Sequence, residues 1–256
     1  MLGCPRPAAM PPGLVSLERS SRAALAPSAA ALAKLYVMPR SPRPKRLVVL
    51  SAGWSGERVL VRLLAAGGAM RVMGYALAEP VRDAAGHLRR VLTSRDDRAT
   101  AALVMPHHLW LFNDLDADRF VADLVADGVT VVSLARRDAD DRGLSRALCG
   151  EGAEVLPREA RLVDAGEVVL YAQESEHACE WFARMCPDRE HQVVFEDDLA
   201  SAPERTALAS RLATLIGLPG WDAPPECEVP DHRALWERIA NADQLRSDVE
   251  ALRAVG

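Results

Sequence analysis

The sequence predicts an α/β fold in three layers, with a central, mostly parallel sheet flanked by helices. Short aliphatic runs alternate with longer amphipathic segments over residues 45–256, and strands that alternate with helices form parallel sheets. The runs are continuously hydrophobic, as is typical of strands that are covered on both faces. The chain has 256 residues, of which 49% are hydrophobic and 26% charged, enough for one large domain with a core.

The first predicted unit is a strand, a turn and a helix between Lys45 and Gly68. Leu47–Leu50 is the strand, Ser51–Gly56 the turn, and Glu57–Ala66 a helix with one apolar stripe. Such a turn points several backbone N–H groups at one place, where the helix dipole adds partial positive charge. This stretch predicts a phosphate- or sulfate-binding loop, and an ordinary turn without a ligand is the alternative.

The rest of the domain continues the alternation. Residues 82–100 are polar and are interpreted as a surface excursion, residues 150–168 as irregular and residues 219–231 as a Pro-rich loop. Further strands are expected at Ala101–Met105, Val129–Leu134 and Gln192–Phe195. Helices are expected at Asp116–Ala126, Asp140–Cys149, Val168–Met185, Pro203–Ile216 and Arg233–Val255, the last broken near Asn241.

Residues 1–44 are rich in Pro and Ala and are predicted to form a flexible arm before the α/β domain of residues 45–256. The first 50 residues hold eight basic residues and one acidic residue, within a chain of net charge −5. A basic arm can contact an anionic partner, but a solvated tail is the simpler interpretation. Nucleic-acid binding is not expected, because basic and aromatic residues do not interleave.

The composition also indicates the cellular compartment in which the protein is expected. The five cysteines include no CxxC pair, which favours reduced thiols in a cytoplasmic protein over disulfides or a zinc site. No run approaches the roughly 18 apolar residues of a membrane span, and the N-terminus has no secretory pattern. The only lysines are Lys34 and Lys45, and neither lies where a nucleotide-binding GxxxxGK[ST] loop needs one.

A second junction follows another buried strand. Arg137 lies just past the strand that ends at Leu134, and Ser145 lies two helical turns further along. An arginine fork and a hydroxyl in this arrangement can grip one phosphate monoester. The alternative is a surface arginine and a solvent-facing serine.

The order of these motifs resembles the sulfotransferases that use PAPS (3′-phosphoadenosine-5′-phosphosulfate), most closely the bacterial group that sulfates trehalose and related glycans. In that family a strand leads into [PS]-R-S-G-[ST]-[ST], which holds the 5′-phosphosulfate. A later L-x-R-R-D-x-x-R-Q-A-x-S holds the 3′-phosphate, and this chain has a similar stretch with one extra residue, Asp141, from Leu134 to Ser145. The stretches Val194–Leu199 and Trp236–Asn241 are also similar to the family.

The resemblance implies a P-loop-like fold over residues 46–242 that moves a sulfuryl group from PAPS to a hydroxyl of a glycan or small metabolite, without a metal. The loop departs from the family where Trp54 replaces the basic residue and Glu57 and Arg58 replace two hydroxyl residues. The residues implied to bind PAPS are Ser51, Gly53, Ser55, Gly56, Glu57, Arg58, Arg137 and Ser145.

A transferase of this kind needs a general base for the acceptor hydroxyl. The resemblance suggests a glutamate after the first helix, and Glu79 is the nearest one. His107 and His108 are rivals, because they follow a predicted strand and imidazole titrates near neutrality. The alternatives are a glutamate that packs before a proline and two loop histidines.

Three functions are compatible with these patterns. The first is sulfuryl transfer, with an acceptor pocket built from loops within residues 70–100 and 150–190. The second is a degenerate sulfotransferase fold that serves as a binding or interaction module, which Trp54, Glu57 and Arg58 favour. The third is an unrelated P-loop-like nucleotide kinase, which the missing loop lysine disfavours.

Overall fold

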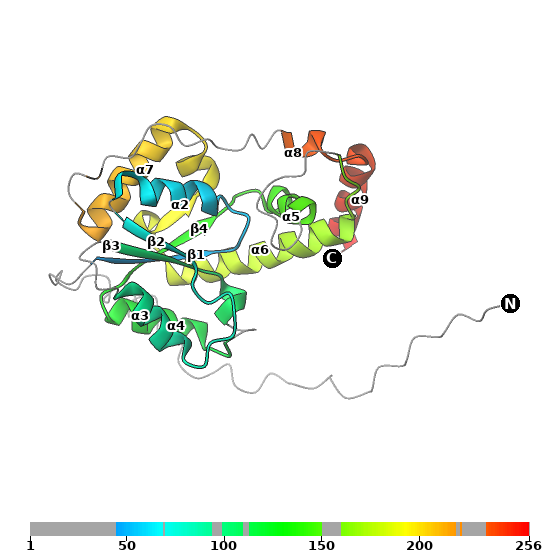
Figure 1. Cartoon of the computed structure of the whole chain (residues 1–256). Helices are drawn as coiled ribbons and strands as arrows, with labels where there is room; N and C mark the ends of the chain where they lie inside the picture. Colours follow the sequence, from blue (N-terminus) through cyan, green and yellow to red (C-terminus); the bar gives the residue numbers. More distant parts are fainter. Residues whose placement is uncertain are drawn as a thin grey trace, which may run out of the picture.

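The computed structural model describes residues 45–68, 70–93, 99–109, 113–149, 160–218, 221 and 234–255. The predicted arm of residues 1–44 and most of the predicted Pro-rich loop lie outside these ranges. Five strands form one parallel sheet in the order β2-β3-β1-β4-β5 (Figure 1), which confirms the predicted α/β class. The strands are β1 (Arg46–Ser51), β2 (Met70–Tyr75), β3 (Ala99–Val104), β4 (Thr130–Ala135) and β5 (Gln192–Val194).

The central strand β1 lies between β3 and β4, with Leu47 opposite Ala101 on one side and Thr130 on the other. From β1 the chain runs outward to β2 and back to β3, then crosses to β4 and β5 on the far side. The strand order therefore reverses at β1. In open parallel sheets, ligands bind outside the carboxyl ends of the strands at such a reversal.

The two faces of the sheet carry different helices (Figure 1). Leu47 and Val49 of β1 belong to the core beneath α2 (Glu57–Ala65) and α7 (Ala202–Ile216). Val48 and Leu50 alternate to the other face, as successive strand side chains must. That face is covered by α3 (Ala84–Leu92), α4 (Ala117–Ala126) and α6 (Ala165–Met185).

A third apolar cluster joins α5 (Ala139–Cys149) to the start of α6 and to the C-terminal helices α8 (Ala234–Glu237) and α9 (Ala242–Val255). The α5–α6 crossing is close, because a Cβ at Gly143 would overlap the carbonyl oxygen of Val168. The predicted break near Asn241 is confirmed. The Asn241 amide exchanges two hydrogen bonds with the backbone of Val163, at 3.0 and 3.1 Å.

Two elements between β1 and β3, the strand β2 and the helix α3, were not predicted from the sequence. The edge strand β2 is partly exposed and contains Arg71 and Gly74, so it lacks the continuous apolar run used to find the others. The predicted surface excursion of residues 82–100 contains α3, which buries Leu88 and Leu92. None of the helices in the described ranges is long and apolar enough to cross a membrane.

Candidate functional site: the β1–α2 loop and the carboxyl edge of the sheet

The loop between β1 and α2 is a tight turn at the carboxyl end of the central strand. Gly53, Trp54 and Gly56 have φ values of 79°, 51° and 98°, the left-handed region that glycine adopts at least cost. Gly56 is doubly constrained, because a Cβ there would overlap the ring of Phe195. Trp54 has no such freedom and is held in this conformation by its surroundings.

The carboxylate of Glu57 turns back into this loop. Glu57 is the first residue of α2 and is 9% exposed. The Ser51 hydroxyl donates to one carboxylate oxygen and the Ser55 N–H donates to the other, over 3.0 Å. The carboxylate is thus held by one hydroxyl and one backbone N–H at a helix N-terminus, the arrangement that binds anions in proteins.

Further hydrogen bonds close the loop on itself. The Gly53 N–H donates to the Ser51 hydroxyl oxygen, and the Ser55 hydroxyl donates to the Gly53 carbonyl, both over 3.1 Å. The structure therefore brings together the predicted loop residues from Ser51 to Glu57. Arg58 is exposed on the next position of α2.

A buried arginine from another element holds the opposite side of the loop. Arg142 of α5 is 2% exposed and donates to the carbonyl oxygens of Ala52 and Gly53, and to that of Tyr171 in α6. Burial lowers the pKa of Arg142 to about 10, and the negative charge of Glu57 opposes that shift. Sequence reasoning gave Arg142 no role, although it stands three residues before Ser145 on the same helical face.

The predicted phosphate-gripping pair is built differently from the expectation. Arg136, not Arg137, donates to the Ser145 hydroxyl, over 3.1 Å. Arg136 is 4% exposed and also lies 3.5 Å from the carboxylate of Glu196 and 3.6 Å from that of Asp141. Consecutive side chains at the end of a strand point in opposite directions, so only one of the two arginines can face Ser145.

Arg137 lies at the surface. Its guanidinium donates to both carboxylate oxygens of Asp197, at 2.5 and 2.7 Å, and this hydrogen bond raises the arginine's pKa. The Arg137 N–H donates to Glu196 over 2.9 Å. The 3′-phosphate role expected for Arg137 therefore stays a prediction, on a side chain that already has a bidentate partner.

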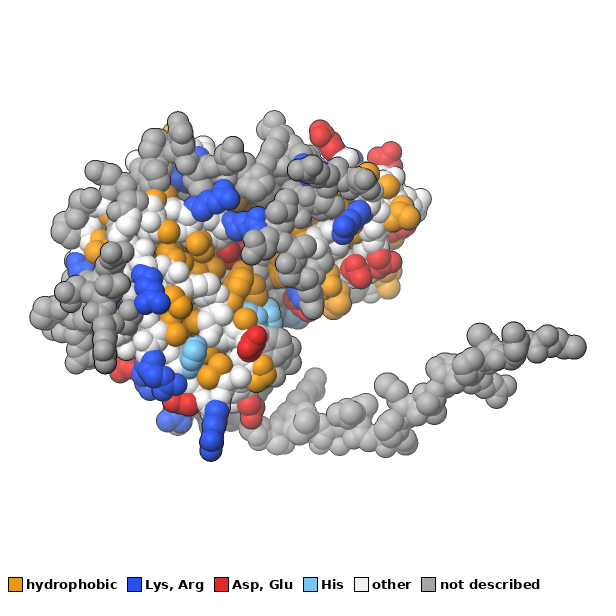
Figure 2. Space-filling model, in the orientation of Figure 1, with side chains coloured by type: hydrophobic (Ala, Val, Ile, Leu, Met, Phe, Trp, Pro, Cys, Tyr) orange, Lys and Arg blue, Asp and Glu red, His pale blue; other side chains and the backbone are white. Residues whose placement is uncertain are grey.

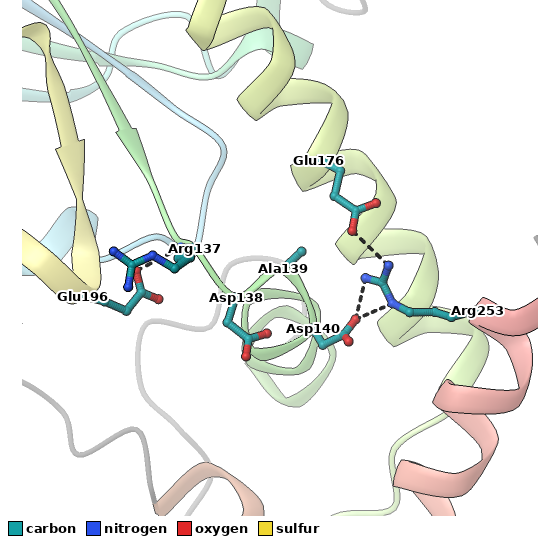
Figure 3. A pocket seen from close by; sticks show the side chains of 7 residues that line it. All are labelled: Arg137, Asp138, Ala139, Asp140, Glu176, Glu196 and Arg253. Carbon is teal, nitrogen blue, oxygen red and sulfur yellow. Dashed lines mark hydrogen bonds and ion pairs between the residues drawn. The ribbon is translucent and has the colours of Figure 1, made fainter. Parts of the chain in front are cut away.

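An open hollow of about 460 Å³ lies beside these arginines, at the N-terminus of α5 (Figure 3). Arg253 of α9 reaches across it and pairs with Asp140 over 2.5 Å and with Glu176 over 2.9 Å. Carboxylates outnumber arginines in its lining, so the hollow is acidic. The lining residues are Arg137, Asp138, Ala139, Asp140, Glu176, Glu196 and Arg253.

The candidate bases lie on the other side of the loop, at the ends of β2 and β3. His108 is buried, and its ring makes edge contacts with those of Tyr75 and His107. Burial, and then the charge of His107, lowers the pKa of His108 to about 4, so its imidazole is neutral at pH 7. Glu79 is exposed in the turn after β2.

Electrostatic links cross this edge of the sheet. Tyr75 as a whole is 36% exposed, yet burial around its phenol, and then the charge of Glu57, raises its pKa. Asn113 ties the segments after β2 and β3 together by donating to the carbonyls of Leu77 and His108, at 3.3 and 2.7 Å. The charge of Glu57 thus acts both on Tyr75, at the end of β2, and on Arg142 of α5.

The part of the chain that the structure describes contains no group of three or more His, Cys, Asp or Glu side chains placed to hold a metal ion. On the face drawn in Figure 2, the coloured basic side chains lie in separate places, and acidic ones gather around α9 and the start of α6.

Compared with protein-family models, curated proteins and solved structures, the chain matches none. Its function is therefore inferred from its residues and their geometry.

Proposed function

We propose that this chain is a catalytically degenerate protein of the PAPS-dependent sulfotransferase type, and that it acts as a binding or interaction module without transferring a sulfuryl group. One observation carries the proposal. The carboxylate of Glu57 accepts the hydrogen bonds of Ser51 and Ser55, in the loop that the sequence resemblance assigns to the 5′-phosphosulfate. A donor could bind this loop only by displacing a carboxylate that is nearly excluded from water.

The second predicted phosphate position supports the same conclusion. The cation that faces Ser145 is Arg136, and Asp141 and Glu196 already balance its charge. A phosphate placed there would lie near two carboxylates. Each like-charge pair about 4 Å apart costs roughly 4 kcal/mol at the effective dielectric of a protein surface. The residues present therefore do not fit the 3′-phosphate of PAPS in this conformation.

The loop would also lack a positive charge that stabilises the transition state of sulfuryl transfer. Charge develops on the leaving and equatorial oxygens in such reactions, and catalysis depends on cations placed around them. Trp54 stands where the family has a basic residue, and its ring cannot supply that charge. The nearby guanidinium of Arg146 stacks 5.1 Å from the Trp54 ring and 4.0 Å from that of Tyr171, and is paired with Glu174.

The second candidate is an active sulfotransferase that acts on a hydroxyl of a glycan or small metabolite. The Arg136–Ser145 pair favours it, because it places an arginine and a hydroxyl at the carboxyl end of β4, as a phosphate site requires. This candidate needs Glu57 to leave the loop when the donor binds. Glu79, His107 and His108 remain its proposed general bases.

Calorimetric titration of the full chain with PAP (3′-phosphoadenosine-5′-phosphate), without magnesium, tests the proposal. PAPS turnover is then measured with a panel of glycan and metabolite hydroxyls. We expect no binding in the micromolar range and no release of PAP, with the chain shown to be folded by circular dichroism. Sustained, acceptor-dependent release of PAP would overturn the degenerate assignment and establish the second candidate.

A further inference from the structure

Arg142 and Glu57 are two buried, opposite charges on either side of the β1–α2 loop. The donors of Arg142 go to backbone carbonyls, and within the described residues it makes no ion pair within 4 Å. A guanidinium that is 2% exposed needs a counter-charge nearby. Burial lowers the pKa of Arg142, and among the nearby carboxylates the negative charge of Glu57 opposes that shift most strongly.

The two groups grip different atoms of the same loop. Arg142 holds the carbonyl oxygens of Ala52 and Gly53, so the N–H groups of the same two peptide units, those of Gly53 and Trp54, point away from it. The Ser51 hydroxyl and the Ser55 N–H meet on the carboxylate of Glu57 instead. The buried cation holds the loop carbonyls, and the loop presents one hydroxyl and one N–H to the same carboxylate.

We propose that Glu57 is a built-in latch: its carboxylate occupies an oxyanion site that Arg142 preorganises, and a tetrahedral oxyanion, sulfate or phosphate, binds there only when this carboxylate leaves. The inference rests on the proposed function, because it explains why the wild-type loop does not hold a donor. It adds that the loop keeps two donors for an oxyanion, the Ser51 hydroxyl and the Ser55 N–H, and that one side chain occupies them.

A tethered ligand is a strong competitor. Groups joined by a short flexible link reach effective concentrations of the order of millimolar or more. Sulfate or phosphate must exceed that concentration to displace Glu57 from the wild-type loop. Glu57→Ala abolishes the competition, and Glu57→Gln leaves only a neutral amide oxygen to compete. Both variants also remove the negative charge that opposes Arg142, and both changes favour an added anion.

The test is a titration of the wild-type chain, Glu57→Gln and Glu57→Ala with sodium sulfate, phosphate or PAP against sodium chloride at matched ionic strength. The readout is the fluorescence of Trp54, isolated by subtracting the signal of the same proteins with Trp54→Phe. Glu250→Gln is the matched control, because it removes one exposed negative charge on α9. PAPS turnover by the wild type is a separate readout that bears on the proposed function alone.

We expect sulfate or phosphate to bind both Glu57 variants at least tenfold more tightly than the wild type or the control. If the variants unfold in buffer, refolding by sulfate but not by chloride is the expected result. Equal affinity in all four proteins, no binding by folded variants, or unfolding that sulfate does not reverse would each overturn the latch. Binding of PAP, but not of free phosphate, would also overturn it, because the site would then require the nucleoside.

Discussion

Arg136, and not its neighbour Arg137, donates to the hydroxyl of Ser145, over 3.1 Å. The two arginines follow β4 directly, and the backbone turns one into the protein and the other out to solvent. Arg136 is buried against two carboxylates and the ring of Phe195, whereas Arg137 meets Asp197 at the surface. Adjacent, chemically identical side chains therefore have different structural roles.

Arg136→Ala is expected to destabilise the protein by about 3 kcal/mol, because it leaves Asp141 and Glu196 without their buried counter-charge. Arg137→Ala is the matched control, since exposed ion pairs contribute little to stability. Urea unfolding at pH 7, with the free energy extrapolated to water, distinguishes the two. An equal loss in both variants would show that the buried ion pairs of Arg136 with Asp141 and Glu196 contribute no more to stability than the exposed pair of Arg137.

Arg142→Met and Glu57→Gln are expected to be strongly non-additive. Each single substitution leaves one buried charge without its counterpart, at a cost of about 3 kcal/mol or more. The double variant removes both charges, so it should be less destabilised than the sum of the two by about 1–3 kcal/mol. A double-mutant cycle of unfolding free energies measures this coupling. Strict additivity would show that the two charges do not sense each other.

Gly143→Ala is expected to destabilise the protein by about 1–3 kcal/mol, although alanine is the better helix former. The added Cβ would overlap the Val168 carbonyl oxygen, and backbone cannot move aside as a flexible side chain can. Gly74→Ala, on the exposed edge strand β2 where an added Cβ meets no atom within 4 Å, is the control and should be near neutral or stabilising. Thermal denaturation of the two variants compares them, and a stabilised Gly143→Ala would contradict the close α5–α6 crossing.

His108 should make the protein sensitive to mild acid. Its folded pKa is about 4, below the value of about 6.5 in an unfolded chain, so the unfolded state binds the proton first. Neutral His108 makes its full contribution to the free energy of unfolding above pH 6.5. That contribution is lost as the pH falls toward 4, and the total loss is about 3 kcal/mol. Urea unfolding of the wild type and His108→Gln at pH 4.5, 5.5 and 7 measures it.

The matched control is His177→Gln, which removes an exposed histidine of α6. We expect the pH dependence between 4.5 and 6.5 to flatten in His108→Gln and to persist in His177→Gln. If both variants keep the slope of the wild type, another group is responsible for it.

The strands with continuous aliphatic runs were predictable, because burial on both faces produces a pattern that is visible in the sequence of each strand alone. The edge strand β2 was not, since its partial exposure admits Arg71 and Gly74. The helix α3 was not predicted, because it lies in a mostly polar segment and buries only a few apolar side chains, among them Leu88 and Leu92.

At the candidate site, the sequence predicted the loop residues Ser51 to Glu57 and indicated that Glu57 stands where the resembled family has a hydroxyl residue. It did not indicate that this carboxylate would bind the loop's own donors. It also gave no role to Arg142, because a helical arginine in a charged stretch has the pattern of a solvated face.

The sequence by itself determined the α/β class and the position of the loop, since local periodicity and turn residues are properties of short segments. The tertiary structure decided which arginine faces Ser145, that Arg142 is buried, and that Glu57 closes the loop. Those outcomes depend on the direction in which each side chain leaves its element and on the packing of α5 against α6 and the β1–α2 loop. Such contacts join residues about 90 positions apart, as between Arg142 and the loop carbonyls, and no local pattern records them.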